Sequence, residues 1–400
     1  MEIVDFEPGL REEWDAFVAK HPLAGFGHLS GNFALAGVTD GVRNLSLVAR
    51  EGRQIAGILP LFARTGRVLR SVAVTDMVSG AFFPAGPLIS PAAKGKAETN
   101  VLTALLEAAR ARAAAAGADR IVIAYPNVTG GQPTIGRAGY SPLLHHGYRA
   151  RPAVGLLLDL TQTAEQLGAG RKSGCRQSIA KAQASGATVD AVRDRDEWMA
   201  CYEMNVQTLG ELAHSEVQLA AIWDHFIQSG QAHAYAVRAN GVTAAVAVTI
   251  ESHGTAYYWH GWRANAQLPG ASHLALWTAI LAARDRGCRA FELGSLEFEH
   301  AKNIGISQFK QSFGGTAFQT MAAACELRPV KSAAIALADA ALAAVRQRRG
   351  RPAPAAAVSA AAKPAEATQP TEQPRAIVSP ASTSAVAAGV PLPTATAGKH

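Results

Sequence analysis

Side chains that could stabilise charge or move a proton gather between residues 257 and 316 of this 400-residue chain. Lys310 stands four residues before a double glycine, Gly314-Gly315, and glycine lets the backbone approach a bound molecule closely. An ammonium group beside such a segment can stabilise negative charge that develops during a reaction. Lys310 is therefore our first candidate for a catalytic residue, and the two glycines are candidates for substrate binding.

His260 and Glu292 form the second set of candidates, because imidazole and carboxylate groups can accept and donate protons. His260 lies in the β-rich run 255–261, and Glu292 lies in the short apolar run 289–293. If these runs form adjacent strands, the two side chains lie at neighbouring strand ends and could relay a proton. Tyr258, in the same run as His260, is a candidate for substrate contact. The alternative for His260 and Glu292 is a buried, hydrogen-bonded structural role.

A basic stretch near the middle of the chain could bind an anion. Arg171, Lys172, Arg176 and Lys181 fall within residues 170–185, which have the pattern of an amphipathic helix. Lys172 and Arg176 are four residues apart and would share a helix face. We predict that Lys172, Arg176 and Lys181 contact a phosphate or pyrophosphate. A solvated helix face is the alternative explanation.

No metal site is predicted. The four cysteines, Cys175, Cys201, Cys288 and Cys325, are isolated, without the paired spacing of metal ligands. His145 and His146 are adjacent, so on a strand they would point to opposite faces. Reduced thiols in a cytoplasmic protein are the simplest interpretation.

The elements that position these candidates form a strand, helix, strand unit. An apolar run at 255–261 precedes a helix at 272–286, whose apolar residues Leu274, Trp277, Ile280 and Leu281 have helical spacing. A strand at 289–293 follows, then a loop that leads to Lys310. Before this unit, Asn240-Gly241 has the signature of a tight hairpin turn.

The order of elements occurs twice, which predicts two related domains. Each half has a hairpin with a glycine turn, a long helix that ends at Gly117 or Gly287, and a strand directly afterwards. We predict an α/β (α+β) fold of two tandem domains at 1–150 and 151–328, each a mixed, mostly antiparallel sheet flanked by helices. A strand at Phe318–Leu327 is expected to pack back on the first domain.

The C-terminal residues differ in composition and in charge. Residues 346–400 hold five arginines and two lysines against two glutamates, so most of the net charge of +7 lies there. We predict a basic, alanine-rich helix at 329–349 and a disordered alanine- and proline-rich tail at 350–400. The chain has no signal-peptide pattern and no transmembrane segment. We expect a cytoplasmic protein whose basic tail could hold it at the inner face of a membrane.

Taken together, these residues resemble a known family. The motifs are Ile179-Ala180-Lys181-Ala182, Tyr257-Tyr258-Trp259-His260-Gly261, Phe291-Glu292-Leu293-Gly294 and, most specifically, Phe309-Lys310-x-x-Phe313-Gly314-Gly315. They resemble the FemAB-like branch of the GNAT acyltransferase superfamily, over roughly residues 1–328. In the first half, Trp14 and Ala85-Gly86-Pro87-Leu88 extend the resemblance.

The resemblance implies two tandem GNAT-like domains and a transfer of an acyl or aminoacyl group to an amine. Lys310 matches the family lysine. Some members use aminoacyl-tRNA to extend a peptidoglycan precursor, and acetyltransferase-like members occur with exopolysaccharide or envelope genes. Residues 192–229 lack the long charged coiled-coil arm that some peptidoglycan enzymes insert, so the tRNA donor is one of two open possibilities.

The second possible donor is acetyl-CoA or another acyl-CoA. Gln267-x-x-Gly270-x-Ser272, just before a predicted helix, is similar to the loop that holds pyrophosphate in single-domain acetyltransferases. In that loop, backbone N–H groups at a helix N-terminus bind the anion. Gln267, Gly270 and Ser272 are thus candidate cofactor-binding residues, although Pro269 and the serine at the last position depart from the pattern.

Three functions agree with this sequence. The first is transfer of an acyl or aminoacyl group to an amine of an anionic or lipid-linked cell-envelope precursor, such as a peptidoglycan or exopolysaccharide intermediate. The second is CoA-dependent N-acetylation of a small molecule or sugar. The third is a non-catalytic adaptor that keeps the fold and uses its basic tail to bind a membrane or a partner.

Overall fold

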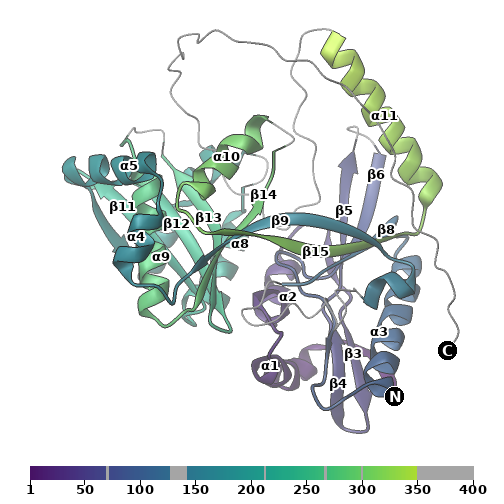
Figure 1. Ribbon diagram of the computed structural model, residues 1–400. Helices are drawn as coiled ribbons and strands as arrows, with labels where there is room; N and C mark the ends of the chain where they lie inside the picture. Colours follow the sequence, from purple (N-terminus) through teal and green to yellow (C-terminus); the bar gives the residue numbers. More distant parts are fainter. Residues whose placement is uncertain (69–71, 127–141, 211–212, 265–267, 299–300, 349–400) are drawn as a thin grey trace, which may run out of the picture. The chain divides into compact units, whose positions relative to one another are not determined.

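We analysed a computed structural model that describes residues 1–68, 72–126, 142–210, 213–264, 268–298 and 301–348 (Figure 1). Among the residues described, the first half of the chain contains three α-helices and eight strands. They are β1 (Glu2–Asp5), α1 (Arg11–Lys20), α2 (Gly31–Gly37), β2 (Val42–Asn44), β3 (Leu47–Glu51), β4 (Gln54–Leu59), β5 (Phe62–Val68), β6 (Val72–Val78), β7 (Leu88–Ile89), α3 (Lys96–Ala115) and β8 (Arg120–Ala124).

The second half has a longer set of strands and eight α-helices among the described residues. These elements are β9 (Arg149–Asp159), α4 (Ala164–Gly170), α5 (Ser173–Ala184), β10 (Thr188–Ala191), α6 (Arg195–Ala200), α7 (Tyr202–Leu209), α8 (Glu216–Ile222), β11 (Ala232–Ala239), β12 (Val242–Ser252), β13 (Thr255–Arg263), α9 (Ala271–Asp285), β14 (Ala290–Leu296), α10 (Ala301–Gln311), β15 (Thr316–Glu326) and α11 (Pro329–Arg348). A turn of π-helix, Trp223–Ile227, continues α8.

Two sheets organise these strands. One has the order β1-β3-β4-β7, and the other has eleven strands in the order β10-β11-β12-β13-β14-β9-β15-β8-β6-β5-β2. Two neighbouring pairs are parallel, β6 with β8 and β13 with β14, and the connection within each pair contains a long helix, α3 or α9. The duplicated plan predicted from the sequence therefore appears as two strand, helix, strand crossovers within a mixed α/β fold.

Strand β15 joins the two sets of strands. It pairs antiparallel with β9 from Thr316 to Ala324 and with β8 from Ala322 to Glu326. The strand predicted at Phe318–Leu327 thus lies between a strand of the first half and a strand that begins at the expected boundary near residue 150.

Local sequence explains several boundaries. Asn240 and Gly241 have φ angles of 51° and 77°, which is the backbone conformation of the tight turn that joins β11 to β12. Thr163 and Ser215 begin helices α4 and α8 with capping boxes, and Asp194 accepts hydrogen bonds from the first N–H groups of α6. Helix formation at these points is therefore encoded by short-range hydrogen bonds.

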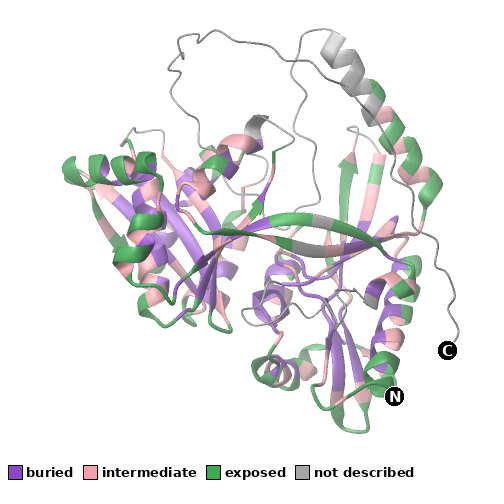
Figure 2. Cartoon of the chain, viewed as in Figure 1, coloured by how far each residue is buried: buried purple, intermediate pink, exposed green. Residues whose placement is uncertain are grey.

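The second-half strands β11, β12 and β13 of the eleven-stranded sheet are buried on both faces (Figure 2). One face packs against α9 and α5 through an apolar cluster that includes Leu274, Ile280 and Phe291. The other face holds an aromatic cluster that includes Trp198, Trp259 and Trp262, and Phe26 and Phe83 from the first half belong to it. In the first half, α3 covers the strands through residues such as Leu105 and Ile121.

Two sequence predictions need correction or restriction. The segment that leads to Lys310, expected as a loop, forms helix α10, so Lys310 projects from a helix and only residues 312–315 form the turn. Residues 265–267, including Gln267, and the tail at 350–400 lie outside the described residues. No helix in the described part of the chain is long and apolar enough to span a bilayer.

Candidate functional site

Lys310 lies near the end of α10 and is almost completely buried, with 1% of its surface exposed. Its Nζ donates a hydrogen bond of 2.8 Å to the backbone carbonyl oxygen of Ser295 in β14. A charged lysine is costly to bury unless it is paired and hydrogen-bonded, so this location is unusual for a purely structural lysine. Lys310 is therefore not a solvated surface lysine.

Glu292 is the acidic partner of Lys310. Burial lowers the pKa of Lys310 to about 8, against the attraction of the Glu292 and Glu297 carboxylates. Burial raises the pKa of Glu292 to about 8, against the attraction of Lys310. The Oε2 atom of Glu292 is shielded from solvent and has no hydrogen-bond partner in the described structure. Titrating groups with such shifted pKa values are typical of sites that transfer protons.

The two strands that carry this region separate beside Glu292. β13 and β14 pair only from Thr255–Ala290 to Tyr257–Glu292, although β13 continues to Arg263 and β14 to Leu296. On its other edge, β14 changes register against β9 between Glu292 and Ser295. Backbone groups beyond Glu292 are thus released from regular pairing with β13, and Lys310 caps the strand end through Ser295.

Three side chains of α10 form hydrogen bonds with the end of β14 and the residue that follows it. Asn303, Ser307 and Lys310 follow a spacing of four and three residues, so they share the inner face of the helix. The Asn303 amide donates to Glu297 Oε2. Ser307 Oγ accepts from the Glu297 N–H at 2.8 Å and donates to the Glu297 carbonyl at 2.9 Å. Our sequence analysis missed Glu297, Asn303 and Ser307. The spacing of Asn303 and Ser307 from Lys310, which places them on one helix face, was the signal that could have identified these two.

Gly314 and Gly315 pack closely against the backbone of α4 and β9. Gly314 and Gly315 have φ angles of 87° and 91°. A Cβ atom would lie 2.6 Å from the Gly170 carbonyl oxygen at Gly314 and 2.6 Å from the Leu157 carbonyl oxygen at Gly315. The close backbone approach predicted for a ligand is therefore made to α4 and β9, and substrate binding by these glycines stays a prediction.

His260 is not joined to Glu292. Glu292 is in register with Tyr257, three residues before His260. The His260 Nε2 atom instead lies 2.7 Å from His214 Nε2, at hydrogen-bond distance. Burial lowers the pKa of His214 to about 4 and that of His260 well below its usual value. The expected proton relay between His260 and Glu292 is therefore not formed, and His214, which was missed, is the partner of His260.

The basic candidates lie on the surface of α5. Lys172, Arg176 and Lys181 are exposed, and Arg176 donates to the carbonyl oxygen of Arg171 at the end of α4. Arg171 itself stacks 3.9 Å above the Trp277 ring. Lys172 and Arg176 stand at the N-terminal end of α5, and Lys181 lies further along the helix, so a solvated face and an anion-binding face both agree with their positions.

The CoA-type loop is only partly described, and its glycine is packed. Gly270 precedes α9, and a Cβ atom there would lie 1.9 Å from the Ser178 carbonyl oxygen of α5. This close packing explains why glycine is needed at this position. Ser272 lies in the first turn of α9 and is partly exposed. Pyrophosphate binding by Gly270 and Ser272 therefore stays a prediction.

Tyr258 is partly buried and lies over Gly261, where a Cβ atom would lie 1.9 Å from the Tyr258 hydroxyl oxygen. Burial raises the pKa of Tyr258, so the phenol stays protonated at neutral pH. Tyr258 faces the apolar cluster that contains Phe291, on the side of the sheet covered by α9. Tyr258 directly follows the last residue of β13 that pairs with β14, and its contact with a substrate stays a prediction.

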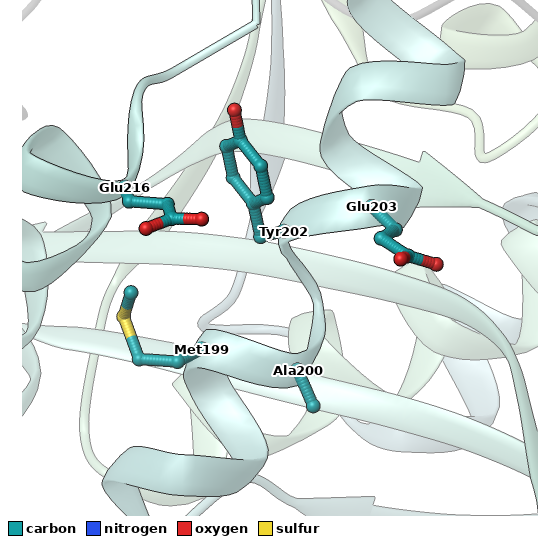
Figure 3. Close-up of a pocket in the computed structure, with 5 residues that line it drawn as sticks. All are labelled: Met199, Ala200, Tyr202, Glu203 and Glu216. Atoms are coloured by element: carbon teal, nitrogen blue, oxygen red, sulfur yellow. The ribbon is translucent and has the colours of Figure 1, made fainter.

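A pocket of about 360 Å³ lies away from the predicted residues. It is lined by Met199, Ala200, Tyr202, Glu203 and Glu216, from α6 to α8 (Figure 3). The two carboxylates come from different helices and flank the tyrosine. In the described ranges, no group of three or more His, Cys, Asp or Glu side chains could hold a metal ion.

Comparison with known proteins identifies a family domain in the second half of the chain. Residues 169–311 match the family model of the acetyltransferase (GNAT) domain. This range contains α5, the strands β10 to β14 and Lys310 at its end. No curated protein sequence matches the chain at a significant level.

One solved structure shares the fold across most of the chain, and two others are reported with lower scores. A crystal structure of FemX has a TM-score of 0.61 and 15% identity, covering 84% of this chain and 100% of that chain. The C-terminal domain of a putative lysylphosphatidylglycerol synthetase from Agrobacterium fabrum has a TM-score of 0.49 and 16% identity, covering 83% and 96%. A tandem GNAT protein from the clavulanic acid biosynthesis pathway has a TM-score of 0.49 and 13% identity, covering 81% of this chain and 98% of that chain. Residues 169–311 therefore match a GNAT acetyltransferase domain, and most of the chain shares the fold of FemX.

Proposed function

We propose that this protein is an acyl- or aminoacyltransferase that acts on an amine of a cell-envelope precursor, such as a peptidoglycan or exopolysaccharide intermediate. The observation that carries the proposal is the buried Lys310, held against Ser295 and facing Glu292 where β13 and β14 separate. The match of residues 169–311 to the acetyltransferase domain supports transfer of an acyl group. The resemblance of Phe309-Lys310-x-x-Phe313-Gly314-Gly315 to the FemAB-like motif motivates the class of acceptor.

In the proposed reaction, the nitrogen of the acceptor amine forms a bond to the carbonyl carbon of the donor. The negative charge that develops on the carbonyl oxygen is stabilised by the ammonium group of Lys310. Glu292 accepts one amine proton, and its raised pKa suits this task near neutral pH. The ester or thioester bond then breaks, and the proton passes to the leaving oxygen or sulfur.

The donor in this proposal is an aminoacyl-tRNA or an acyl-CoA. The exposed cations Lys172, Arg176 and Lys181 on α5 offer a surface for phosphate groups of a tRNA or of an anionic substrate. In this proposal the basic tail contributes a peripheral contact with the membrane that presents a lipid-linked acceptor.

The test is an assay of the full chain with aminoacyl-tRNA or acetyl-CoA as donor and UDP-linked peptide precursors as acceptors. We expect the wild type to form an amide and Lys310→Ala to be slower by about 100-fold or more, as for loss of a group that stabilises an oxyanion. Unchanged transfer by Lys310→Ala would reject the assigned role.

A calorimetric titration distinguishes the second donor. Absence of acetyl-CoA binding at millimolar concentration would remove the CoA-dependent alternative. The adaptor alternative makes a different prediction, since removal of residues 346–400 should then abolish function. A transferase should keep most of its turnover on a water-soluble acceptor after this deletion.

A further inference from the structure

We infer that Asn303 and Ser307 are positioning residues that hold the Glu297 carboxylate beside Lys310, so that the buried ammonium group keeps its positive charge. This inference rests on the proposed function, because it concerns the same lysine. It extends that function to groups that do not touch the reacting atoms.

The first step of the argument is the geometry of α10. Asn303, Ser307 and Lys310 are 6%, 2% and 1% exposed, so the helix presents three polar side chains to the protein interior. Buried polar groups are costly unless each has a partner. Here every one of the three contacts the segment from Ser295 to Glu297, and none of the three bonds is needed to form the helix itself.

The second step is that Ser307 fixes the backbone of Glu297. Its hydroxyl group bonds both the N–H and the carbonyl oxygen of this one residue, at 2.8 and 2.9 Å. Glu297 directly follows β14, so no strand partner would otherwise hold it. The double hydrogen bond replaces the pairing that the strand has lost.

The third step is that Asn303 fixes the side chain. Its amide donates to Glu297 Oε2, which directs a half-buried carboxylate that could otherwise turn into solvent. The two carboxylates that attract the Lys310 charge are then Glu292 from β14 and Glu297 from the loop. Among the described residues, Tyr257 of β13, in register with Glu292, is a further titratable group at this position.

The consequence concerns the charge of the lysine. Glu292 has a pKa raised to about 8 and is partly protonated at neutral pH, so its attraction is weakened. Glu297, held by the side chains of α10, supplies the second attraction that burial of Lys310 requires. Loss of its charge should lower the pKa of Lys310, because an opposite charge close to an ammonium group stabilises the charged form.

The experiment is an NMR titration of the full chain labelled with ¹³C at the lysine Cε atoms, which needs no substrate. The Lys310 signal is identified by its absence in Lys310→Met. We expect its titration midpoint to fall by about one pH unit in Glu297→Gln. In Asn303→Ala and Ser307→Ala, we expect a smaller fall in the same direction.

Gln308→Ala is the matched control, because Gln308 lies on the exposed face of the same helix. Its Lys310 midpoint should equal that of the wild type. An unchanged midpoint in Glu297→Gln would overturn the inference, and a shift in Glu297→Gln without one in Asn303→Ala and Ser307→Ala would remove their positioning role. Glu297→Gln keeps the shape of the side chain, so it tests the charge even if Asn303→Ala fails to fold.

This titration and the transfer assay can fail independently. If the wild type formed no amide with either donor, the proposed function would be wrong while the midpoints would be unaffected. If the midpoints were equal in all variants while Lys310→Ala lost transfer, the lysine would keep its catalytic role and the positioning inference alone would fall.

Discussion

The ammonium group of Lys310 donates a hydrogen bond of 2.8 Å to the carbonyl oxygen of Ser295. This contact joins the last turn of α10 to the strand end that has separated from β13. An ammonium group has three N–H donors, so two are left for a carboxylate or a bound substrate. The lysine is thus held in one orientation and can still interact with a second group.

The rate of transfer should depend on pH in two directions. The reaction needs Glu292 without its proton and Lys310 with it, and both pKa values are shifted to about 8. We expect a bell-shaped profile with a maximum near pH 8, whose limbs belong to the coupled pair. Glu292→Gln should remove the acidic limb, and Lys310→Arg the alkaline limb. A flat profile in the wild type would contradict both assignments.

Replacement of Gly315 by alanine should destabilise the protein. The φ angle of 91° and the Leu157 carbonyl oxygen 2.6 Å from the new Cβ both oppose a side chain. We expect a loss of about 2–4 kcal/mol in the free energy of unfolding, measured by urea denaturation. Gly174→Ala in α5 is the control, since a Cβ there meets nothing within 4 Å and should stabilise the helix by about 0.5 kcal/mol. Similar effects at both positions would refute this explanation.

The start of α11 should be held by an ion pair. Lys331 Nζ lies 2.8 Å from Asp119 Oδ1 and donates to the Ala73 carbonyl oxygen. Lys331→Met leaves the buried carboxylate poorly paired. We expect a loss of about 1–3 kcal/mol, less than for a fully buried pair because a third of the lysine side chain is exposed. Lys94→Met, at an exposed position, should have no measurable effect.

The pH dependence of this ion pair has a definite sign. Burial alone raises the pKa of Asp119, but hydrogen bonds from Lys331 and Thr75 outweigh it, and the pKa lies below its ordinary value. The stabilisation is thus present above the ordinary carboxyl pKa and is lost as the pH falls through the lower folded value. The difference between wild type and Lys331→Met should be constant from pH 5 to 7 and shrink below about pH 4. A difference that grows in acid would exclude this origin.

The His214–His260 pair should make the fold sensitive to acid. Burial lowers both pKa values below the ordinary histidine value, so the unfolded chain binds protons more readily between about pH 4 and 6.5. Stability should fall as the pH is lowered through this range. His260→Gln should reduce the slope by about 1.4 kcal/mol per pH unit, which corresponds to one proton. The free energy of unfolding is measured at pH 5, 6 and 7 for the wild type and for His260→Gln. The same dependence on pH in both proteins would contradict the buried neutral pair.

Short-range sequence signals predicted much of the fold. The Asn240-Gly241 turn and the helix that begins near residue 272 follow from backbone preferences and apolar spacing alone, and the structure confirms both. The prediction of a loop before Lys310 was wrong. This segment forms helix α10, and the polar residues Asn303, Ser307 and Lys310 occupy its inner face. Such a helix lacks the apolar stripe of a packed helix, and its polar face makes sense only once Ser295 and Glu297 are known to lie opposite.

The candidate site was predictable in its members and less so in its contacts. Lys310 and Glu292 could be chosen by residue type and by the family motif. Their mutual attraction depends on where β13 and β14 stop pairing, which no local pattern encodes. His260 shows the opposite case, since its partner His214 lies 46 residues earlier in the chain. Long-range contacts of this kind require the tertiary structure.

The position of β15 bears on how the chain folds during synthesis. Strands β8 and β9 each leave an edge unpaired until residues 316–326 have been made and can insert between them. Chains that are still shorter than this expose two strand edges, which are sites for association with other chains. The N-terminal half therefore depends on late-synthesised residues for its final sheet, and a chaperone that shields strand edges on the ribosome would act before β15 emerges.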